Sequence, residues 1–254
     1  EIQKAIFYAK KGRPGPVLLD LPMDMQWADI NENTLIEFKP PITPYELINQ
    51  HKIDKISEIH RLLLEAERPV MLVGGGISSK ETCQKIKTYC DQYSIPLVTS
   101  FAGKQLFPDD WRNNFGFIGT MGMHSANNTL HNSDVLLVIG SRLSWRQIRS
   151  NPDAFAKYTK IIHIDLDENE LNGNVESFIT LHCDGDTFFN LTAKNMQIKE
   201  SASGVNIDKR SAYINECNIL KNTYQYLPKD LTQQDGLHPH LVMEELNSVA
   251  ASDS

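Results

Sequence analysis

The stretch Pro69-Val70-Met71-Leu72-Val73-Gly74-Gly75-Gly76 decides the fold that this sequence predicts. Its first half is an apolar run as long as a short buried strand, and the glycines follow without a break. Ser78 and Glu81 have the spacing of a capping box, which opens a helix by satisfying free backbone N–H groups. Strand, glycine turn and helix, in this order, form the first unit of a parallel α/β sheet.

The same unit recurs along the chain. A helix with an apolar face over residues 56–66 precedes the first strand, and Pro69 marks its end. Further strands are predicted by the apolar runs 96–99, 134–140 and 160–165, with 181–183 as another candidate. Continuous apolar runs that alternate with helices are typical of a parallel sheet covered on both faces. We therefore predict an α/β fold with a Rossmann-like, doubly wound parallel sheet as a central domain over residues 55–195.

Residues 1–24 have the pattern of the last elements of a domain. Residues 2–9 predict the end of a helix, and Gly12-Arg13-Pro14-Gly15-Pro16 must break it because proline lacks a backbone N–H donor. Val17-Leu18-Leu19-Asp20-Leu21 then predicts a buried strand. A helix end and one strand cannot bury their own apolar faces, so we expect residues 1–24 to belong to a domain whose bulk precedes this chain.

The remaining segments predict two linkers and the start of a further domain. Residues 25–54 contain several prolines and no sustained apolar period, which favours a linker. Residues 196–236 are largely polar and predict a second linker, with a helical stretch around 213–226. Pro239 then opens a helix with an apolar face, so we expect residues 237–254 to begin another domain.

Composition and charge argue against two classes of partner. The chain has 254 residues, a net charge of -7 and no cluster of Lys and Arg with interleaved aromatics, so nucleic-acid binding has no support. Its longest apolar runs are far shorter than the roughly 20 residues that a membrane helix needs. No signal peptide opens the chain, and we expect a cytoplasmic protein.

Cysteine and histidine form no metal site by spacing. Cys83, Cys90, Cys183 and Cys217 include no C-x-x-C pair, and a reducing compartment accounts for them. The histidines, including the pair around Pro239, form no ligand set, so no metal ligand is predicted.

Three loops are candidates for a ligand site. The run Gly74-Gly75-Gly76 lies between a strand and a helix, where bare backbone lets a pyrophosphate approach the helix N-terminus. A tight strand-to-helix turn also needs glycine when nothing binds, and both interpretations stay open. Gly119-Thr120-Met121-Gly122-Met123-His124 is a second glycine-interrupted loop.

The third loop, Gly140-Ser141-Arg142-Leu143-Ser144-Trp145-Arg146, directly follows a predicted strand. Open parallel sheets bind ligands at their carboxyl edge, where Arg142 or Arg146 is placed to clamp a diphosphate. The alternative for each arginine is an ordinary surface ion pair. Asp165 ends another strand and is placed either to accept a ribose hydroxyl or to begin an acidic helix.

Taken together, these segments resemble the acetolactate synthase branch of the thiamine-diphosphate-dependent enzymes. They occur in the family's order and at plausible spacing over most of the chain. The matching stretches are Gly12-Arg13-Pro14-Gly15-Pro16-Val17-Leu18-Leu19-Asp20-Leu21-Pro22-Met23-Asp24, the triple glycine, Met121-Gly122-Met123-His124, Gly140-Ser141-Arg142, Ile162-His163-Ile164-Asp165-Leu166-Asp167 and Asp184-Gly185-Asp186.

The resemblance implies a parent enzyme with a pyrimidine-binding, a central and a diphosphate-binding domain. The parent is expected to use thiamine diphosphate and Mg²⁺ to decarboxylate a 2-oxo acid such as pyruvate and to pass on the two-carbon unit. It is also expected to form a homodimer or homotetramer. The family's activating Glu and Gly-Asp-Gly motif do not match this chain, and Asp184-Gly185-Asp186 is not that motif. We therefore expect no catalytic residue here, and no activity from this chain alone.

Acetolactate synthases also hold FAD on the central domain. The resemblance assigns cofactor contacts to Gly74, Gly75, Gly76, Met121, Gly122, Met123, His124, Gly140, Arg142, Arg146, Asp165 and Asp186. Ser144-Trp145 stands where two acidic residues are usual, and Ser125 stands where glycine is usual.

Three alternatives to a true acetolactate synthase stay open. One is a relative that acts on a different 2-oxo acid. A second is a non-catalytic module that binds FAD or another nucleotide, such as an electron carrier. A third is a structural module that spaces two catalytic domains.

Overall fold

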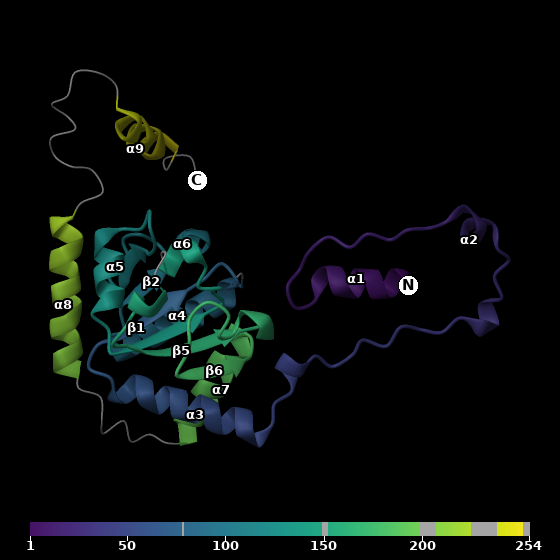
Figure 1. Cartoon of the computed structure of the whole chain (residues 1–254), viewed down its shortest axis with the longest axis horizontal. Coiled ribbons are helices and arrows are strands. Elements are labelled where there is room, and N and C mark those ends of the chain that lie inside the picture. The colour runs from purple at the N-terminus through teal and green to yellow at the C-terminus, as the bar shows by residue number, and fades with distance from the viewer. Residues whose placement is uncertain (78, 149–151, 199–206, 225–237, 251–254) are drawn as a thin grey trace.

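A parallel sheet forms the centre of the computed structural model, which describes residues 1–77, 79–148, 152–198, 207–224 and 238–250 (Figure 1). Within these residues the sheet has six strands in the order β3-β2-β1-β4-β5-β6. The strands are β1 (Pro69–Val73), β2 (Leu97–Thr99), β3 (Asn114–Phe117), β4 (Val135–Ile139), β5 (Lys160–Asp165) and β6 (Ile179–His182). The strand order reverses direction between β1 and β4, as in a doubly wound fold, and this confirms the predicted fold class.

The register of the central strands aligns their carboxyl ends. Val73 at the end of β1 pairs with Ile139 at the end of β4, which in turn pairs with Ile164 of β5. The loops that follow these strands therefore begin at one level of the sheet.

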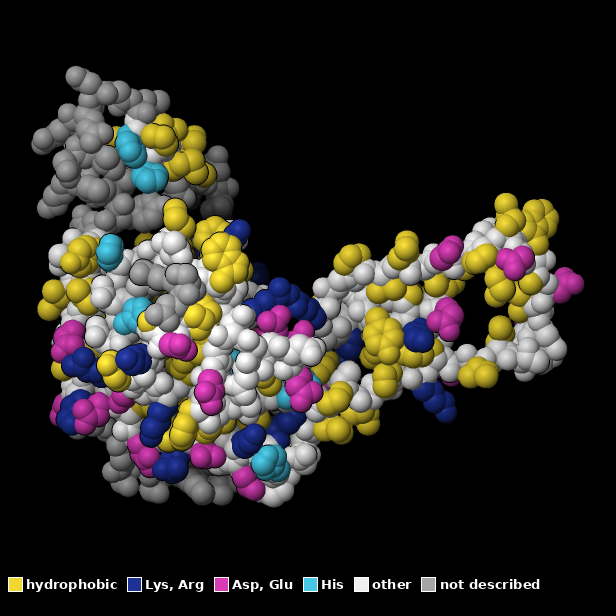
Figure 2. All heavy atoms as spheres, in the orientation of Figure 1, with side chains coloured by type: hydrophobic (Ala, Val, Ile, Leu, Met, Phe, Trp, Pro, Cys, Tyr) yellow, Lys and Arg dark blue, Asp and Glu magenta, His cyan; other side chains and the backbone are white. Residues whose placement is uncertain are grey.

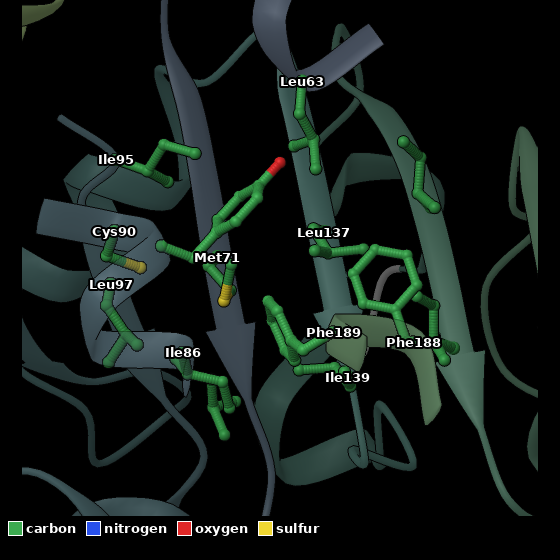
Figure 3. Packing of buried hydrophobic residues seen from close by; sticks show 14 of the residues in the cluster. Leu63, Met71, Ile86, Cys90, Ile95, Leu97, Leu137, Ile139, Phe188 and Phe189 are labelled. Atoms are coloured by element: carbon green, nitrogen blue, oxygen red, sulfur yellow. The ribbon is translucent and has the colours of Figure 1, made fainter. Parts of the chain in front are cut away.

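Helices cover both faces of the sheet because its strands alternate their side chains. Met71 and Val73 point into one core, and Val70 and Leu72 point into the other. The first core contains residues of α3 (Gln50–Glu65), α4 (Lys80–Tyr93) and α7 (Gly185–Ile198). Figure 3 shows Met71, Leu137 and Ile139 of the strands packed with Phe188 and Phe189 of α7. The second core contains residues of α5 (His124–His131), α6 (Trp145–Ile148) and α8 (Ile207–Thr223).

Short elements complete the fold. They are α1 (Ile2–Lys10), α2 (Met23–Trp27) and α9 (Pro239–Ala250), with the 3₁₀ helices η1 (Glu32–Thr34), η2 (Pro44–Glu46), η3 (Phe101–Leu106), η4 (Pro152–Ala154) and η5 (Glu168–Glu170). No helix in the described part of the chain is both long and apolar enough to cross a membrane.

The start of α4 differs from the prediction by one residue. Ser79 is its N-cap, and the Ser79 side chain accepts a hydrogen bond from the backbone N–H of Thr82. Ser78 lies outside the described residues. Glu81 pairs with Lys85 one turn later, so its carboxylate stabilises the helix surface.

Strand β3 was not predicted. Its sequence Asn114-Phe115-Gly116-Phe117 has no continuous apolar run, and glycine weakens a strand pattern. Gly116 has a φ of 96°. Residues with a side chain rarely adopt this conformation, so the backbone favours glycine there, and a Cβ would also displace the flexible side chain of Met123.

Residues 17–21 do not form the predicted buried strand. They are extended, and Leu18 is 94% exposed. A strand requires a hydrogen-bonded neighbour, and no strand among the described residues pairs with this segment. It belongs to the N-terminal arm (residues 1–48), which projects from the sheet domain in Figure 1 and carries many exposed apolar side chains in Figure 2.

Within the segment predicted as a linker with a helical stretch, residues 207–223 form the long helix α8. This helix packs along α5, and its Tyr213 and Cys217 are buried. Arg210 is also fully buried. The sequence of α8 is thin in apolar residues, and Tyr213, Ile214 and Cys217 attach the helix to the second core, whereas Ile219 is exposed. This part of the segment is therefore docked on the central domain.

Candidate functional site

The loops after β1 and β4 touch backbone to backbone at the carboxyl edge of the sheet. The N–H of Gly74 donates to the carbonyl of Ile139 at 2.9 Å, and the N–H of Gly76 donates to the carbonyl of Gly140 at 2.9 Å. A Cβ on Gly74 would lie 2.0 Å from the oxygen of Gly140. Gly74 and Gly76 are therefore needed for this contact whether or not a ligand binds. The backbone of Gly75 and Gly76 is exposed at this edge.

Three successive carbonyls fix the path of the loop after β4, and each accepts a hydrogen bond from a different part of the chain. The donors are Gly76 N–H to Gly140, His163 Nε2 to Ser141 at 2.8 Å, and Asn174 Nδ2 to Arg142 at 3.2 Å. The backbone that presents Arg142 is thus held in one conformation.

This loop also contains two residues with positive φ, Gly140 at 60° and Leu143 at 47°. Leucine rarely adopts this conformation, which costs on the order of 1 kcal/mol or more. The Leu143 side chain is buried in the second core, and this burial compensates for the strain. Such a loop is pre-organised by the surrounding fold.

Arg142 already has an anionic partner. Its Nε lies 2.9 Å from Oε1 of Glu170 in η5. Arg13 of the N-terminal arm approaches the same carboxylate, with Nη1 at 3.8 Å, and lies 4.0 Å from Oδ2 of Asp167. Sequence reasoning identified neither Glu170 nor Arg13 as part of this cluster. The acidic turn after Asp165 was visible in the sequence, but its partners were not.

Arg146 lies in α6 with its guanidinium 5.3 Å from the ring centroid of Trp145. Its carbonyl accepts a hydrogen bond from the N–H of Thr120 at 2.9 Å, which joins α6 to the loop after β3. No acidic side chain pairs with Arg146 within the described residues.

The loop over residues 119–124 is packed closely. Gly122 leaves no room for a side chain, because a Cβ would lie 2.5 Å from the carbonyl carbon of Ile118. The Met123 side chain covers Gly116, and the ring of His124 stacks on Tyr224 at 5.1 Å. Met121 is 84% exposed, so it is the residue of this motif whose side chain is most available to a ligand.

Three exposed apolar side chains lie shortly after strands, in η3, in the loop after β3 and in α6. Phe101 follows β2, Met121 follows β3 and Trp145 follows β4, and each is more than two-thirds exposed. We call these three residues the apolar rim. Sequence reasoning missed Phe101, although it lies two residues beyond a predicted strand.

Asp165 and Asp186 are the two acidic residues among the predicted cofactor contacts. Asp165 Oδ1 accepts a hydrogen bond from the N–H of Asp167, and burial raises the pKa of the Asp165 carboxyl. Asp186 lies 2.5 Å from Nζ of Lys85, so its carboxylate is engaged on the α4 side. The preceding Gly185 packs against Ile77, which places the start of α7 beside the loop after β1. Within the part of the chain that is described, no cluster of His, Cys, Asp or Glu could hold a metal ion.

One partly buried and one fully buried histidine, His60 and His163, are expected to make the stability of the fold depend on pH. His60 contacts the hydroxyl of Tyr89, and His163 donates to Ser141, as given above. Burial lowers the pKa of both side chains from the ordinary value of 6.5. The unfolded chain therefore binds these protons more readily than the folded chain.

We expect the free energy of unfolding to fall as the pH drops below about 6.5, by at most about 1.4 kcal/mol per pH unit for each histidine. Asp165 acts in the opposite direction, because its raised pKa lets the folded chain bind this proton more readily than the unfolded chain. Urea unfolding at pH values on either side of this range measures the slope. A slope that stays unchanged when His60→Gln and His163→Gln are combined would contradict this assignment.

Comparison with known proteins gives a consistent result along the chain. Residues 56–190 match the family model described as the central domain of thiamine pyrophosphate enzymes. The acetolactate synthase large subunit of Corynebacterium glutamicum is 29% identical over 260 residues, which cover all of this chain and 39% of that protein.

Two further relatives match a shorter part of the chain. The probable acetolactate synthase large subunit of Methanocaldococcus jannaschii is 36% identical over 174 residues, or 68% of this chain and 29% of that protein. The acetolactate synthase large subunit of Buchnera aphidicola is 30% identical over 183 residues, or 70% of this chain and 31% of that protein. The chain spans about a third of the length of the curated relatives that it matches.

Proposed function

Because the chain belongs to the thiamine pyrophosphate enzyme family through its central domain, we propose that it is the central part of an acetolactate synthase-like enzyme. The observation that carries this proposal is the likeness to acetolactate synthase large subunits over the entire chain. The whole enzyme would decarboxylate a 2-oxo acid such as pyruvate and transfer the two-carbon unit, with thiamine diphosphate and Mg²⁺ as cofactors. No residue of this chain is assigned to either cofactor.

We also propose the domain limits and the assembly of the whole enzyme. Residues 1–24 would end a preceding domain, 25–54 would connect it to the central domain of 55–195, and 237–254 would begin a following domain. Exposed apolar side chains such as Leu18, Met23 and Leu246 support this division, because they have no core to enter here. The enzyme would be a cytoplasmic homodimer or homotetramer.

An activity assay tests the proposed reaction. A polypeptide that contains this chain together with its flanking domains is expected to form acetolactate from pyruvate when thiamine diphosphate and Mg²⁺ are added. This chain alone is expected to be inactive. Turnover of a different 2-oxo acid, with none of pyruvate, would favour the related alternative, and activity without thiamine diphosphate would contradict the proposal.

We propose that the carboxyl edge of the sheet binds a dinucleotide such as FAD. Its exposed backbone at Gly75 and Gly76 lies near the start of α4, where a diphosphate is stabilised by the helix N-terminus. Arg142 and Arg146 supply positive charge on the adjoining loop, and the apolar rim offers contacts for a flat ring. Asp165 ends β5, and in this proposal its carboxylate would accept a hydrogen bond from a ribose hydroxyl. Bound FAD would bring a redox-active ring system to this edge.

Titration of the chain with FAD, followed by flavin fluorescence, measures this site. We expect saturable quenching, and we expect Arg146→Gln to weaken binding about tenfold to 100-fold, since a hydrogen bond between charged groups contributes roughly 1.5–3 kcal/mol. Lys157→Gln is the matched control, because Lys157 is exposed before β5 at the opposite edge of the sheet. No quenching at high micromolar protein, or equal losses in both variants, would contradict FAD binding at this edge.

A further inference from the structure

Glu170 is shared by two arginines that come from distant parts of the sequence. Its side chain is 21% exposed, and its Oε1 lies 2.9 Å from Nε of Arg142 and 3.8 Å from Nη1 of Arg13. Arg142 follows β4 at the candidate ligand site, whereas Arg13 belongs to the N-terminal arm. One acidic side chain therefore joins the candidate site to the arm.

The backbones on both sides of this ion pair are fixed. The carbonyl of Arg142 accepts from Asn174, and η5 is held by the hydrogen bond from the N–H of Glu170 to the carbonyl of Asp167 at 3.1 Å. Asp167 also caps this turn, with its Oδ1 accepting from the N–H of Asn169 at 3.0 Å. The Arg142 side chain is half exposed and is the part of the pair that is free to change partners.

We propose that Glu170 competes with a phosphate group of the ligand for the side chain of Arg142. This inference rests on the proposed FAD site. An arginine that binds a phosphate through two parallel hydrogen bonds commonly uses Nε, and Glu170 occupies that atom of Arg142. A diphosphate at the exposed glycine backbone must displace the carboxylate before it gains this contact. The apparent affinity for the ligand is therefore lowered in proportion to the fraction of molecules in which Arg142 is not held by Glu170.

The exchange leaves no charge stranded. When a phosphate takes Arg142, the carboxylate of Glu170 still faces Arg13, so it keeps a cationic partner at the protein surface. The ion pair between Arg142 and Glu170 is partly exposed, and breaking such a pair changes the affinity for the ligand about threefold to fivefold.

FAD titration of charge-neutralising variants tests the competition. Glu170→Gln is expected to bind FAD about threefold to fivefold more tightly than the unchanged chain. Asp167→Asn is the matched control, because it removes one negative charge from the same turn but its partner is Arg13, not Arg142. We expect this control to change the affinity less than about twofold. Thermal unfolding of each variant verifies that the fold is retained.

A double-mutant cycle separates competition from general repulsion of an anionic ligand. In the Arg142→Gln background, Glu170→Gln is expected to have no effect on FAD affinity, whereas general repulsion would still be relieved there. An unchanged affinity of Glu170→Gln, or the same gain in both backgrounds, would overturn the competition while FAD binding itself stands. Absence of FAD binding in the unchanged chain and in every variant would overturn the competition and the FAD site together.

Discussion

Replacement of Arg210 by methionine is expected to lower the free energy of unfolding by about 3–5 kcal/mol. The Arg210 side chain is fully buried and donates hydrogen bonds to carbonyls at the ends of two helices. Nη1 donates to Tyr93 O of α4 at 2.8 Å, and Nη2 donates to Leu64 O of α3 at 2.9 Å. Further bonds from the same guanidinium reach the carbonyls of Leu63 and Ala66.

The large effect follows because methionine cannot donate hydrogen bonds to the buried carbonyls around it. Carbonyls at helix C-termini carry partial negative charge, and they stabilise the buried cation in place of an acidic side chain. Without Arg210 several of these carbonyls lose their partner in a buried setting, and each such loss costs about 1–3 kcal/mol. Lysine at this position cannot replace the fork of donors, so Arg210→Lys is expected to recover little stability.

Urea unfolding followed by circular dichroism measures this change, and Lys209→Ala is the matched control. Lys209 precedes Arg210 in α8, is half exposed and pairs with Glu67 at the surface. We expect its replacement to cost less than about 1 kcal/mol. A value for Arg210→Met within about 1 kcal/mol of the unchanged chain would show that α8 is not docked as described.

Replacement of Gly74 by alanine is expected to lower the free energy of unfolding by at least about 3 kcal/mol, or to prevent folding. The new Cβ would lie 2.0 Å from the oxygen and 2.5 Å from the carbonyl carbon of Gly140. Both atoms are backbone, and the strands behind them pair over five residues from Pro69 to Val73, so neither side can yield. FAD binding is expected to be lost together with the loop contact.

Gly15→Ala provides the comparison for this change. A Cβ on Gly15 would meet no atom within 4 Å, and the residue lies in the exposed arm. We expect an effect of less than about 0.5 kcal/mol. Thermal unfolding of both variants measures the difference, and equal stability of the two would contradict the close loop contact at the carboxyl edge.

Apolar pattern alone identified the elements that enter the core from both sides. The runs of β1, β4 and β5 are continuous because each strand is covered on both faces, and these strands were predicted close to their observed limits. Strand β3 was not predicted because Asn114 and Gly116 interrupt its apolar pattern. Residues 17–21 have the same apolar pattern as a buried strand, but pattern cannot show whether a pairing neighbour is present.

The docking of helix α8 was missed for a different reason. It depends on Arg210, a residue type that is almost never buried without partners, and these partners are backbone carbonyls that carry no sequence signal. The polar sequence around it therefore favoured a linker with only a helical stretch.

The candidate site could likewise be predicted only in part from the sequence. The glycine loops and Arg142 could be placed at the carboxyl edge, because parallel strands direct their following loops to one side. The pairing of Arg142 with Glu170, and the approach of Arg13, depend on how the arm meets the sheet domain. Ion pairs between distant segments are set by tertiary structure and leave no local pattern in the sequence.

Backbone amide spectra of the isotopically labelled chain, recorded during titration with FAD, show where the ligand binds. If the carboxyl edge is the site, the largest shifts belong to Gly75, Gly76, Gly122 and Arg142. Shifts confined to the opposite edge, around Tyr158 and Lys160, or spectra that do not change at saturating FAD, would show that FAD does not bind at the carboxyl edge.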